Sequence, residues 1–148
     1  MVDLNIPEQN IEIKSINSKN YIFDLIRKKH LVLTPEEWVR QNLVSYFIND
    51  LNYPKGLIKT ESSLKYNNLK KRSDILIYNN DMTHYMIVEC KSYKMKLNKS
   101  HLNQSAMYNK IYRSRYLMVS NGMEHVVCEY DWEKETFKFR SSIPEFSN

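Results

Sequence analysis

The stretch that most constrains the fold is the hairpin-like segment SDILIYNNDMTHYMIVECKSY, which runs from residue 73 to residue 93. Two runs of alternating aliphatic and aromatic residues, SDILIY and HYMIVEC, flank a polar centre, which is typical of a β-hairpin. If the two strands fold back symmetrically, Leu76 lies opposite Ile87. Both faces of the pair are then apolar in the middle, so we expect the pair to be central in a sheet.

The same register brings charged residues together at one end of this hairpin. Because strand side chains alternate between the two faces, four opposite pairs share one face. They are Tyr78–Tyr85, Leu76–Ile87, Asp74–Glu89 and Arg72–Lys91. Two facing carboxylates repel each other, and in a partly buried position one would lose its charge or the fold would weaken. A divalent cation between Asp74 and Glu89 removes this repulsion.

The residue types at this end of the hairpin suit magnesium. Two carboxylates, a backbone carbonyl, here that of Cys90, and water provide the oxygen ligands that Mg²⁺ prefers, with Mn²⁺ as a substitute. Lys91 could orient or help deprotonate a water, or stabilise a charged phosphorane, so the set suits water attack on a phosphodiester. The alternative is surface charge at strand ends. Glu-x-Lys spacing alone is a weak signal, because Glu12 and Lys14 share it without a partner acid.

Basic residues occur in clusters along the chain. The net charge is +5 and the pI is about 9.1, a mild bias towards polyanions. The clusters are at residues 26–30, 69–72, 91–99 and 110–115. Each could be an ordinary solvated face, but two of them flank the hairpin. The flanking clusters favour a phosphate-facing surface, with Lys71, Arg72 and Lys94 as candidate contacts.

The remaining pattern predicts an α/β (α+β) fold with helices packed on a mixed sheet. Thr34 as N-cap, Pro35 at the first position and Glu37 in a capping box predict a helix that ends near Leu51. A second helix is predicted over 98–112, with Asn98 or Ser100 as its cap. Strands are predicted at 11–16, 20–26, 57–67, 73–78, 84–90, 115–120, 124–132 and 136–140, with a hairpin turn at Asn121-Gly122.

The length of 148 residues predicts a single domain, residues 1–148. We expect an N-terminal β-hairpin at 11–33, a core at about 34–131 and a C-terminal edge strand at 136–140. Cys90 and Cys128 lie in apolar strand runs, which favours buried, reduced thiols over a disulfide. No run of 18 apolar residues and no apolar N-terminal signal region occurs, so we expect a cytoplasmic protein without a membrane partner.

Asp74, fourteen intervening residues and then Glu89-Cys90-Lys91 resemble the motif of PD-(D/E)XK nucleases, with Ser73 where the family name has proline. The likeness extends from about Phe23 to Tyr130. It rests on the segments TPEEWVRQ, NYPKGLI, LKKRSDILIY, MIVECKSY and YLMVSNGMEH, which together resemble the N-terminal nuclease domain of type I restriction enzyme R subunits. The helicase motor of such subunits has no counterpart in these residues, so a stand-alone relative and a fragment are both open.

The resemblance implies a restriction-endonuclease-like fold, a mixed central sheet flanked by helices with the core order α-β-β-β-α-β. It implies magnesium-dependent cleavage of DNA, with Asp74, Glu89 and Lys91 as catalytic residues. An acid from the first helix often joins such sites. We favour Glu36, which lies on the apolar stripe of that helix, over Glu37, which the capping box explains.

Gln104 and Tyr108 in the second helix are four residues apart and share a face. They resemble the Q-x-x-x-Y motif of exonuclease-type and R-subunit members, which implies a place beside the active site and contact with DNA. Ordinary helix polarity is the alternative interpretation.

Three functional hypotheses follow. The first is a metal-dependent endodeoxyribonuclease. The second is a DNA-binding module of a restriction, defence or repair assembly that cleaves only with a partner, or not at all. The third is a regulatory or assembly protein that keeps the fold, against which the facing carboxylates argue. Partners other than DNA would be a second copy of the chain or helicase and specificity subunits.

Overall fold

The computed structural model describes the backbone of residues 1–66 and 69–147, and the side chains of residues 1–60 and 74–147. Its elements follow the order βββ-α-βββ-α-βββ, with a short 3-10 helix, η1 (Lys55–Leu57), after the first α-helix. A small antiparallel sheet contains β1 (Ile13–Ile16), β2 (Lys19–Asp24) and β3 (Lys29–Val32). The main sheet contains β4 (Ile58–Tyr66), β5 (Leu69–Tyr78), β6 (His84–Cys90), β7 (Tyr116–Ser120), β8 (His125–Asp131) and β9 (Thr136–Arg140).

The main sheet is mixed, as expected. Its strands lie in the order β4-β5-β6-β7-β8-β9, and every neighbouring pair is antiparallel except β6 and β7. Parallel neighbours need a crossover connection, which α2 (Lys99–Tyr112) provides. The elements from α1 (Pro35–Asp50) to β7 therefore follow the order α-β-β-β-α-β, and the expected α+β class is confirmed.

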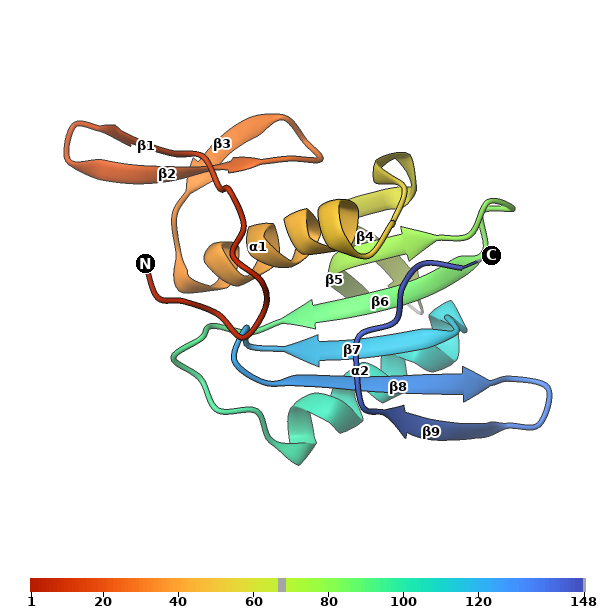
Figure 1. Ribbon diagram of the computed structural model, residues 1–148. Coiled ribbons are helices and arrows are strands. Elements are labelled where there is room, and N and C mark those ends of the chain that lie inside the picture. The colour runs from red at the N-terminus through yellow and green to blue at the C-terminus, as the bar shows by residue number, and fades with distance from the viewer. Residues whose placement is uncertain (67–68, 148) are drawn as a thin grey trace.

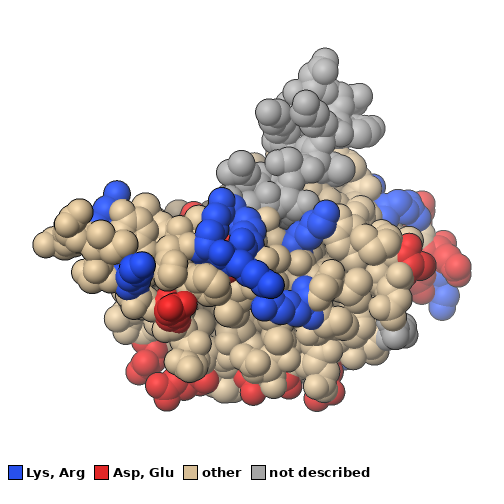
Figure 2. All heavy atoms as spheres, turned by 90° about the horizontal axis from the view of Figure 1, so that it is seen from above, with Lys and Arg blue, Asp and Glu red and all other residues tan. Residues whose placement is uncertain are grey.

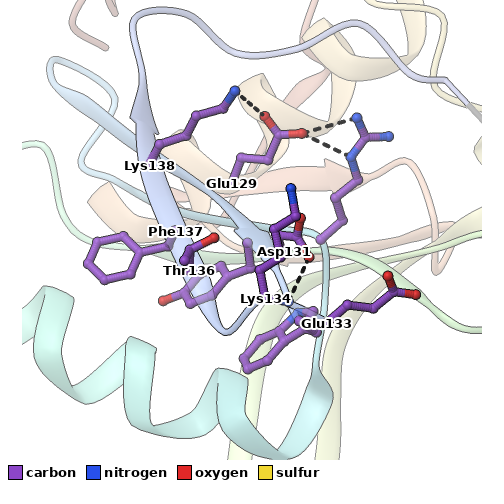
Figure 3. A pocket seen from close by; sticks show the side chains of 10 residues that line it. Glu129, Asp131, Glu133, Lys134, Thr136, Phe137 and Lys138 are labelled. Carbon is purple, nitrogen blue, oxygen red and sulfur yellow. Dashed lines mark hydrogen bonds and ion pairs between the residues drawn. The ribbon is translucent and has the colours of Figure 1, made fainter.

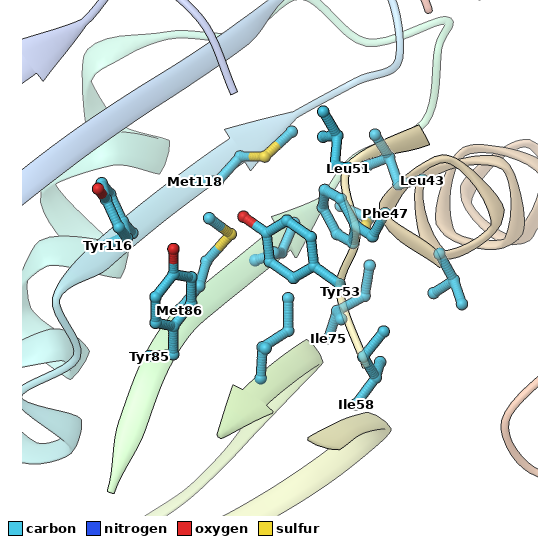
Figure 4. Close-up of a cluster of buried hydrophobic side chains, with 14 of the residues drawn as sticks. Leu43, Phe47, Leu51, Tyr53, Ile58, Ile75, Tyr85, Met86, Tyr116 and Met118 are labelled. Atoms are coloured by element: carbon cyan, nitrogen blue, oxygen red, sulfur yellow. The ribbon is translucent and has the colours of Figure 1, made fainter. Parts of the chain in front are cut away.

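The two helices cover opposite faces of the main sheet (Figure 1). Between α1 and the sheet lies the larger core, which includes Leu43, Phe47, Ile75, Met86 and Met118 (Figure 4). On the α2 side a smaller core gathers Leu76, Ile87, Tyr112, Leu117 and Cys128. Because β5 and β6 contribute to both cores, the expectation of a central strand pair is confirmed.

The helix ends follow the capping residues. Thr34 Oγ1 accepts a hydrogen bond from the backbone N–H of Glu37 at 3.1 Å, and α1 ends at Asp50 as predicted. In α2 the cap is Asn98 rather than Ser100, since Asn98 Oδ1 accepts from the backbone N–H of His101 at 3.1 Å. Neither helix is long and apolar enough to cross a membrane, within the residues that the structure describes.

The hairpin register is the predicted one through three successive pairs: Ile75–Val88, Leu76–Ile87 and Ile77–Met86. It was wrong at the turn, where Tyr78 pairs with His84 and not with Tyr85. The register shifts at this point because a tight turn, with Met82 at φ 69°, closes the strands one residue earlier. Tyr85 has no residue opposite it in the β5–β6 ladder. Its ring packs in the α1-side core, with its centroid 5.9 Å from that of the Tyr53 ring.

Three further differences concern strand limits. The strand β3 was not predicted, because its residues Lys29–Val32 were interpreted as part of a basic cluster. The strand β5 begins at Leu69, earlier than predicted, and pairs with β4 in this part. The strand β6 ends at Cys90, so Lys91 lies beyond the ladder and donates its backbone N–H to Ser120 O at 2.8 Å.

The two cysteines are free and buried, as expected. Cys90 belongs to the core on the α1 side of the sheet, whereas Cys128 belongs to the core on the α2 side. The sheet itself therefore separates the two thiols.

Candidate active site

Asp74 lies on β5 directly before the paired segment of the hairpin. Its side chain is 19% exposed. Its Oδ2 accepts a hydrogen bond from the backbone N–H of Cys90 on β6 at 2.7 Å. The paired segment of β5 and β6 begins at Ile75–Val88, so Asp74 and Glu89 lie one step beyond it, and the charge of Glu89 acts on Asp74. The backbone of β6 thus holds the carboxylate of Asp74 at Cys90, the residue that follows Glu89.

The surroundings of Asp74 disfavour its charge. Burial, and then the nearby carboxylate of Glu89, raise the pKa of Asp74 to about 6. The N–H of Cys90 and the guanidinium of Arg40 act in the opposite direction, and the charge of Glu36 adds to the increase. A carboxyl group in this state gains from any additional cation nearby, as expected of a site that binds one.

Glu89 and Lys91 form an ion pair at the end of β6. Lys91 Nζ lies 3.2 Å from Glu89 Oε1, and both side chains are about four-fifths buried, with exposures of 20% and 17%. Strand alternation places Glu89 on the same face as Ile87, towards α2. The pair therefore combines a carboxylate and an ammonium group beside Asp74.

The helix α1 brings two acids and a base to the site. Glu37 is buried, with 7% exposure, and its Oε1 lies 2.9 Å from a terminal nitrogen of Arg40. The same nitrogen of Arg40 lies 3.9 Å from Asp74 Oδ1. Glu36 is exposed, yet its charge acts on Asp74. The expectation that Glu36 lies on the buried stripe of α1 was wrong: Glu36 faces solvent near Asp74, and Glu37 is the buried acid, paired with Arg40.

The helix α2 contacts the other side of the site. Glu89 and Tyr108 line one small pocket together with Ile87, Ser105 and Tyr112. Tyr108 is half-buried, and Gln104, one turn earlier, is exposed. The structure thus brings Tyr108 to Glu89, and it places Gln104 on the solvent-facing part of the same helix.

The predicted DNA contacts are distributed unevenly. Lys94 is exposed in the loop after β6. The side chains of Lys71 and Arg72 lie outside the described residues. Viewed from above, Lys and Arg side chains gather across the middle of one face, and Asp and Glu lie mostly along its lower edge and at its right-hand end (Figure 2).

The oxygen atoms present fit a hard divalent cation. Among the described residues, no three His, Cys, Asp or Glu side chains are grouped so that they alone could hold a metal. A cation here would therefore rest on the Asp74 and Glu89 carboxylates, the Cys90 carbonyl and water. This is the all-oxygen environment that Mg²⁺ accepts while it keeps part of its hydration shell.

Sequence reasoning missed Arg40. A basic residue in a polar-rich helix suggests a solvated face, but this guanidinium is 4% exposed. One signal was available, because Glu37 and Arg40 are three residues apart and so share a helix face with Val44 of the core.

Comparisons with known proteins identify the family of the chain and support its fold. The family model described as the type I restriction enzyme R protein N terminus matches residues 35–144. A solved structure described as a fragment of an HsdR subunit of a type I restriction enzyme, from Vibrio vulnificus YJ016, superposes with a TM-score of 0.53 at 18% identity. The match covers 76% of this chain and 24% of that one, and at this identity it supports the fold alone. No curated protein matches significantly. Since the family model spans most of its length, the chain belongs to the type I restriction enzyme R protein N-terminal family.

Proposed function

We propose that this protein is a magnesium-dependent endonuclease of the PD-(D/E)XK type that hydrolyses phosphodiester bonds in DNA. The observation that supports this most is the arrangement of Asp74 on β5 beside the C-terminal end of β6. Asp74 is held by the Cys90 N–H at 2.7 Å, its pKa is raised by burial and by Glu89, and Lys91 lies 3.2 Å from Glu89.

The residues divide the work of hydrolysis. The Cys90 N–H orients Asp74, so that one carboxylate oxygen remains for a ligand. Glu89 and the Cys90 carbonyl provide further oxygen atoms, and Lys91 is placed to orient a water or to donate to the charged phosphorane. When bound, Mg²⁺ would supply the positive charge that stabilises the phosphorane.

Arg40 is a positioning residue in this proposal. Its guanidinium lies between Glu37, at 2.9 Å, and Asp74, at 3.9 Å. It therefore connects the first turns of α1 with Asp74 of β5 and supports the ionised form of Asp74. Glu36 is the acid from this helix with access to solvent, and we propose it as an additional ligand through water.

DNA would lie across the end of the sheet and along α2. Tyr108 beside Glu89, Gln104 on the exposed part of that helix and Lys94 in the preceding loop are the proposed contacts. The family supports assembly with the other subunits of a type I restriction enzyme. We further propose that two copies pair when both strands are cut, and that the protein acts in the cytoplasm.

The test is cleavage of supercoiled plasmid and linear DNA by the purified chain with MgCl₂ or MnCl₂. We expect nicking or cleavage that EDTA stops and that Asp74→Ala and Lys91→Ala each abolish. Asp81→Asn, at an exposed aspartate in the β5–β6 turn, is the matched control and should cleave as wild type. Cleavage that persists equally in Asp74→Ala and Lys91→Ala would overturn the proposal.

A second candidate is a DNA-binding module that cleaves only in an assembly. It is favoured by the family, because the matching model describes the N terminus of the R protein of a type I restriction enzyme. Salt-sensitive DNA binding without metal-dependent turnover would support this alternative.

A further inference from the structure

Four aromatic rings form a strip along β8, the following turn and β9: Tyr130, Trp132, Phe137 and Phe139. The rings of Tyr130 and Trp132 stack with centroids 4.8 Å apart and planes 5° from parallel. Phe137 follows at 5.7 Å from Tyr130, and Phe139 at 6.0 Å from Phe137. The strip is therefore a continuous row of rings and not a set of isolated side chains.

Part of this strip is open to solvent. Phe137 and Phe139 are 60% and 64% exposed, although they lie on a sheet face whose centre is covered by α2. Between the strip and α2 runs a groove of about 660 Å³, with Leu117 and Cys128 among its lining residues. Contiguous exposed apolar surface of this kind usually marks a binding site.

The charges beside the rings are cationic on the α2 side. Lys110 and Arg113, at the C-terminal end of α2, line the groove, and the Arg113 guanidinium lies 4.9 Å from the Trp132 ring centroid. Two acids, Asp131 and Glu135, line the groove near the β8–β9 turn. A polyanion would therefore place its charge along α2 and its apolar faces on the rings.

On the opposite face of the same two strands, three cations surround one carboxylate. Glu129 accepts from Arg115 and Arg140 at 3.1 and 3.0 Å. Lys138 Nζ lies 3.9 Å from Glu129 Oε1, and Figure 3 shows these two side chains. This cluster has more positive than negative charge. It also disfavours edge-to-edge pairing of two copies through β9. Antiparallel pairing would bring the Lys138 side chains of the two copies together, and their positive charges repel.

We propose that the aromatic strip binds single-stranded DNA. Bases would stack on Phe137 and Phe139 while phosphates contact Lys110 and Arg113, the combination that holds unpaired strands without sequence preference. A duplex keeps its base faces inside its own stack and offers nothing to these rings. The site is separate from the proposed nuclease centre, because Ser105 and Tyr108 of α2 face Glu89 whereas Ala106 and Lys110 line the groove. It does not depend on catalysis.

The experiment is fluorescence anisotropy of labelled oligothymidylate, in EDTA so that no strand is cut, with the full chain. We expect saturable binding that Phe137→Ala/Phe139→Ala weakens about tenfold or more, since each stacked base contributes substantially. Both side chains are largely exposed, so this variant should fold. Met123→Ala, at an exposed methionine in the β7–β8 turn, is the matched control and should bind as wild type.

A second measurement follows Trp132 itself. In a Trp38→Phe background the remaining indole fluorescence should be quenched by oligothymidylate, and Lys110→Gln should weaken the binding by a few-fold. Equal binding by wild type and Phe137→Ala/Phe139→Ala would overturn the proposal. A second outcome would also overturn it: wild type binds no oligothymidylate, and Phe137→Ala/Phe139→Ala abolishes self-association or subunit binding. The strip would then be a protein interface.

Discussion

Asp24 of β2 and Asp74 of β5 are two aspartates whose pKa values are shifted in opposite directions. Asp24 is fully buried at the end of β2 and accepts from the backbone N–H groups of Ile26 and Arg27, from Arg27 Nε and from Thr60 Oγ1. Burial opposes its charge, but the hydrogen bonds from Arg27 and Ile26 outweigh burial and lower the pKa of Asp24. For Asp74, burial and Glu89 outweigh Cys90 and Arg40, and the pKa is raised to about 6.

The difference shows how burial separates a structural acid from a functional one. A buried carboxylate whose oxygens are all engaged by donors stabilises the fold as an anion. Asp74, by contrast, is placed beside a second acid, which costs stability unless a cation arrives.

The two aspartates are also connected through α1. The backbone N–H of Leu25, next to Asp24, donates to Gln41 Oε1 at 3.3 Å, and Gln41 Nε2 donates to Glu37 Oε2 at 3.3 Å. Glu37 in turn pairs with Arg40, which faces Asp74. The small sheet is thereby linked to the proposed site through buried polar groups.

The largest effect that separates the two aspartates should be on catalysis. Asp74→Ala is expected to lower the rate of magnesium-dependent DNA cleavage by about a thousandfold or more, because a ligand of the proposed cation is lost. Asp24→Asn should leave the rate per folded molecule within a few-fold of wild type. Initial rates, corrected for the folded fraction by circular dichroism, check this. Similar rate losses in both variants would remove the distinction.

Stability should reverse the order of the two positions. Asp24→Asn is expected to lower the free energy of unfolding by about 2–4 kcal/mol, because the buried ion pair with Arg27 is broken. Urea titration measures the change. Asp81→Asn, at an exposed turn aspartate whose Oδ1 accepts from Thr83, is the control and should change stability little.

The pH dependence of the Asp24 contribution has a definite sign. Since the pKa of Asp24 is lowered on folding, its contribution is fully present above the ordinary aspartate pKa of 3.8 and is lost as the pH falls through the lower folded value. The stability difference between wild type and Asp24→Asn should therefore shrink only below about pH 4. A difference already lost at pH 6 would contradict this assignment.

Asp74→Asn should stabilise the chain in EDTA. The amide keeps an oxygen for the Cys90 N–H but removes the unfavourable charge, and we expect a gain of about 2 kcal/mol at pH 8. Because the pKa of Asp74 is raised on folding to about 6, the gain should be full above pH 6, decline towards pH 4 and vanish below it. Thermal melts at pH 8 and pH 5 test this. Excess MgCl₂ should stabilise wild type and not the variant.

The smallest expected effect concerns Arg40. Arg40→Gln is expected to lower cleavage about tenfold, because Asp74 loses both its positioning group and a neighbouring positive charge. Arg40→Lys keeps the charge and should recover part of the rate at the same magnesium concentration. The half-maximal magnesium concentration and kcat, measured for both variants, distinguish positioning from a general loss of folding. Equal defects in both variants at equal stability would argue against a role of the charge.

Much of the fold could be predicted because its signals are local. Thr34 and Asn98 fix helix starts through side-chain hydrogen bonds to residues three positions ahead. Alternation of apolar residues set the β5–β6 register, since a slip by one would expose Ile75 and Val88. It could not predict the register shift that leaves Tyr85 outside the strand pairing, because this depends on the tight turn and on the core between the sheet and α1 that accepts the Tyr85 ring.

The strand β3 and the role of Arg40 escaped prediction for a related reason. The residues of β3 are partly basic and form a strand only because β2 offers an open edge. The sequence suggests a solvated Arg40, because Asp74 is distant along the chain and the burial of Glu37 arises only on folding. The structure places both carboxylates beside the guanidinium.

The sequence by itself determined the order of the elements other than β3, the start of each α-helix, and the β5–β6 register beside which Asp74, Glu89 and Lys91 lie. Only the tertiary structure decided which charges are buried and what surrounds them: Asp24 with its donors, Asp74 with a second acid, Glu37 inside and Glu36 outside. The physical reason is that hydrogen-bond patterns and alternation act over a few residues along the chain. Desolvation and charge coupling depend on distances between segments that meet only when the chain has folded.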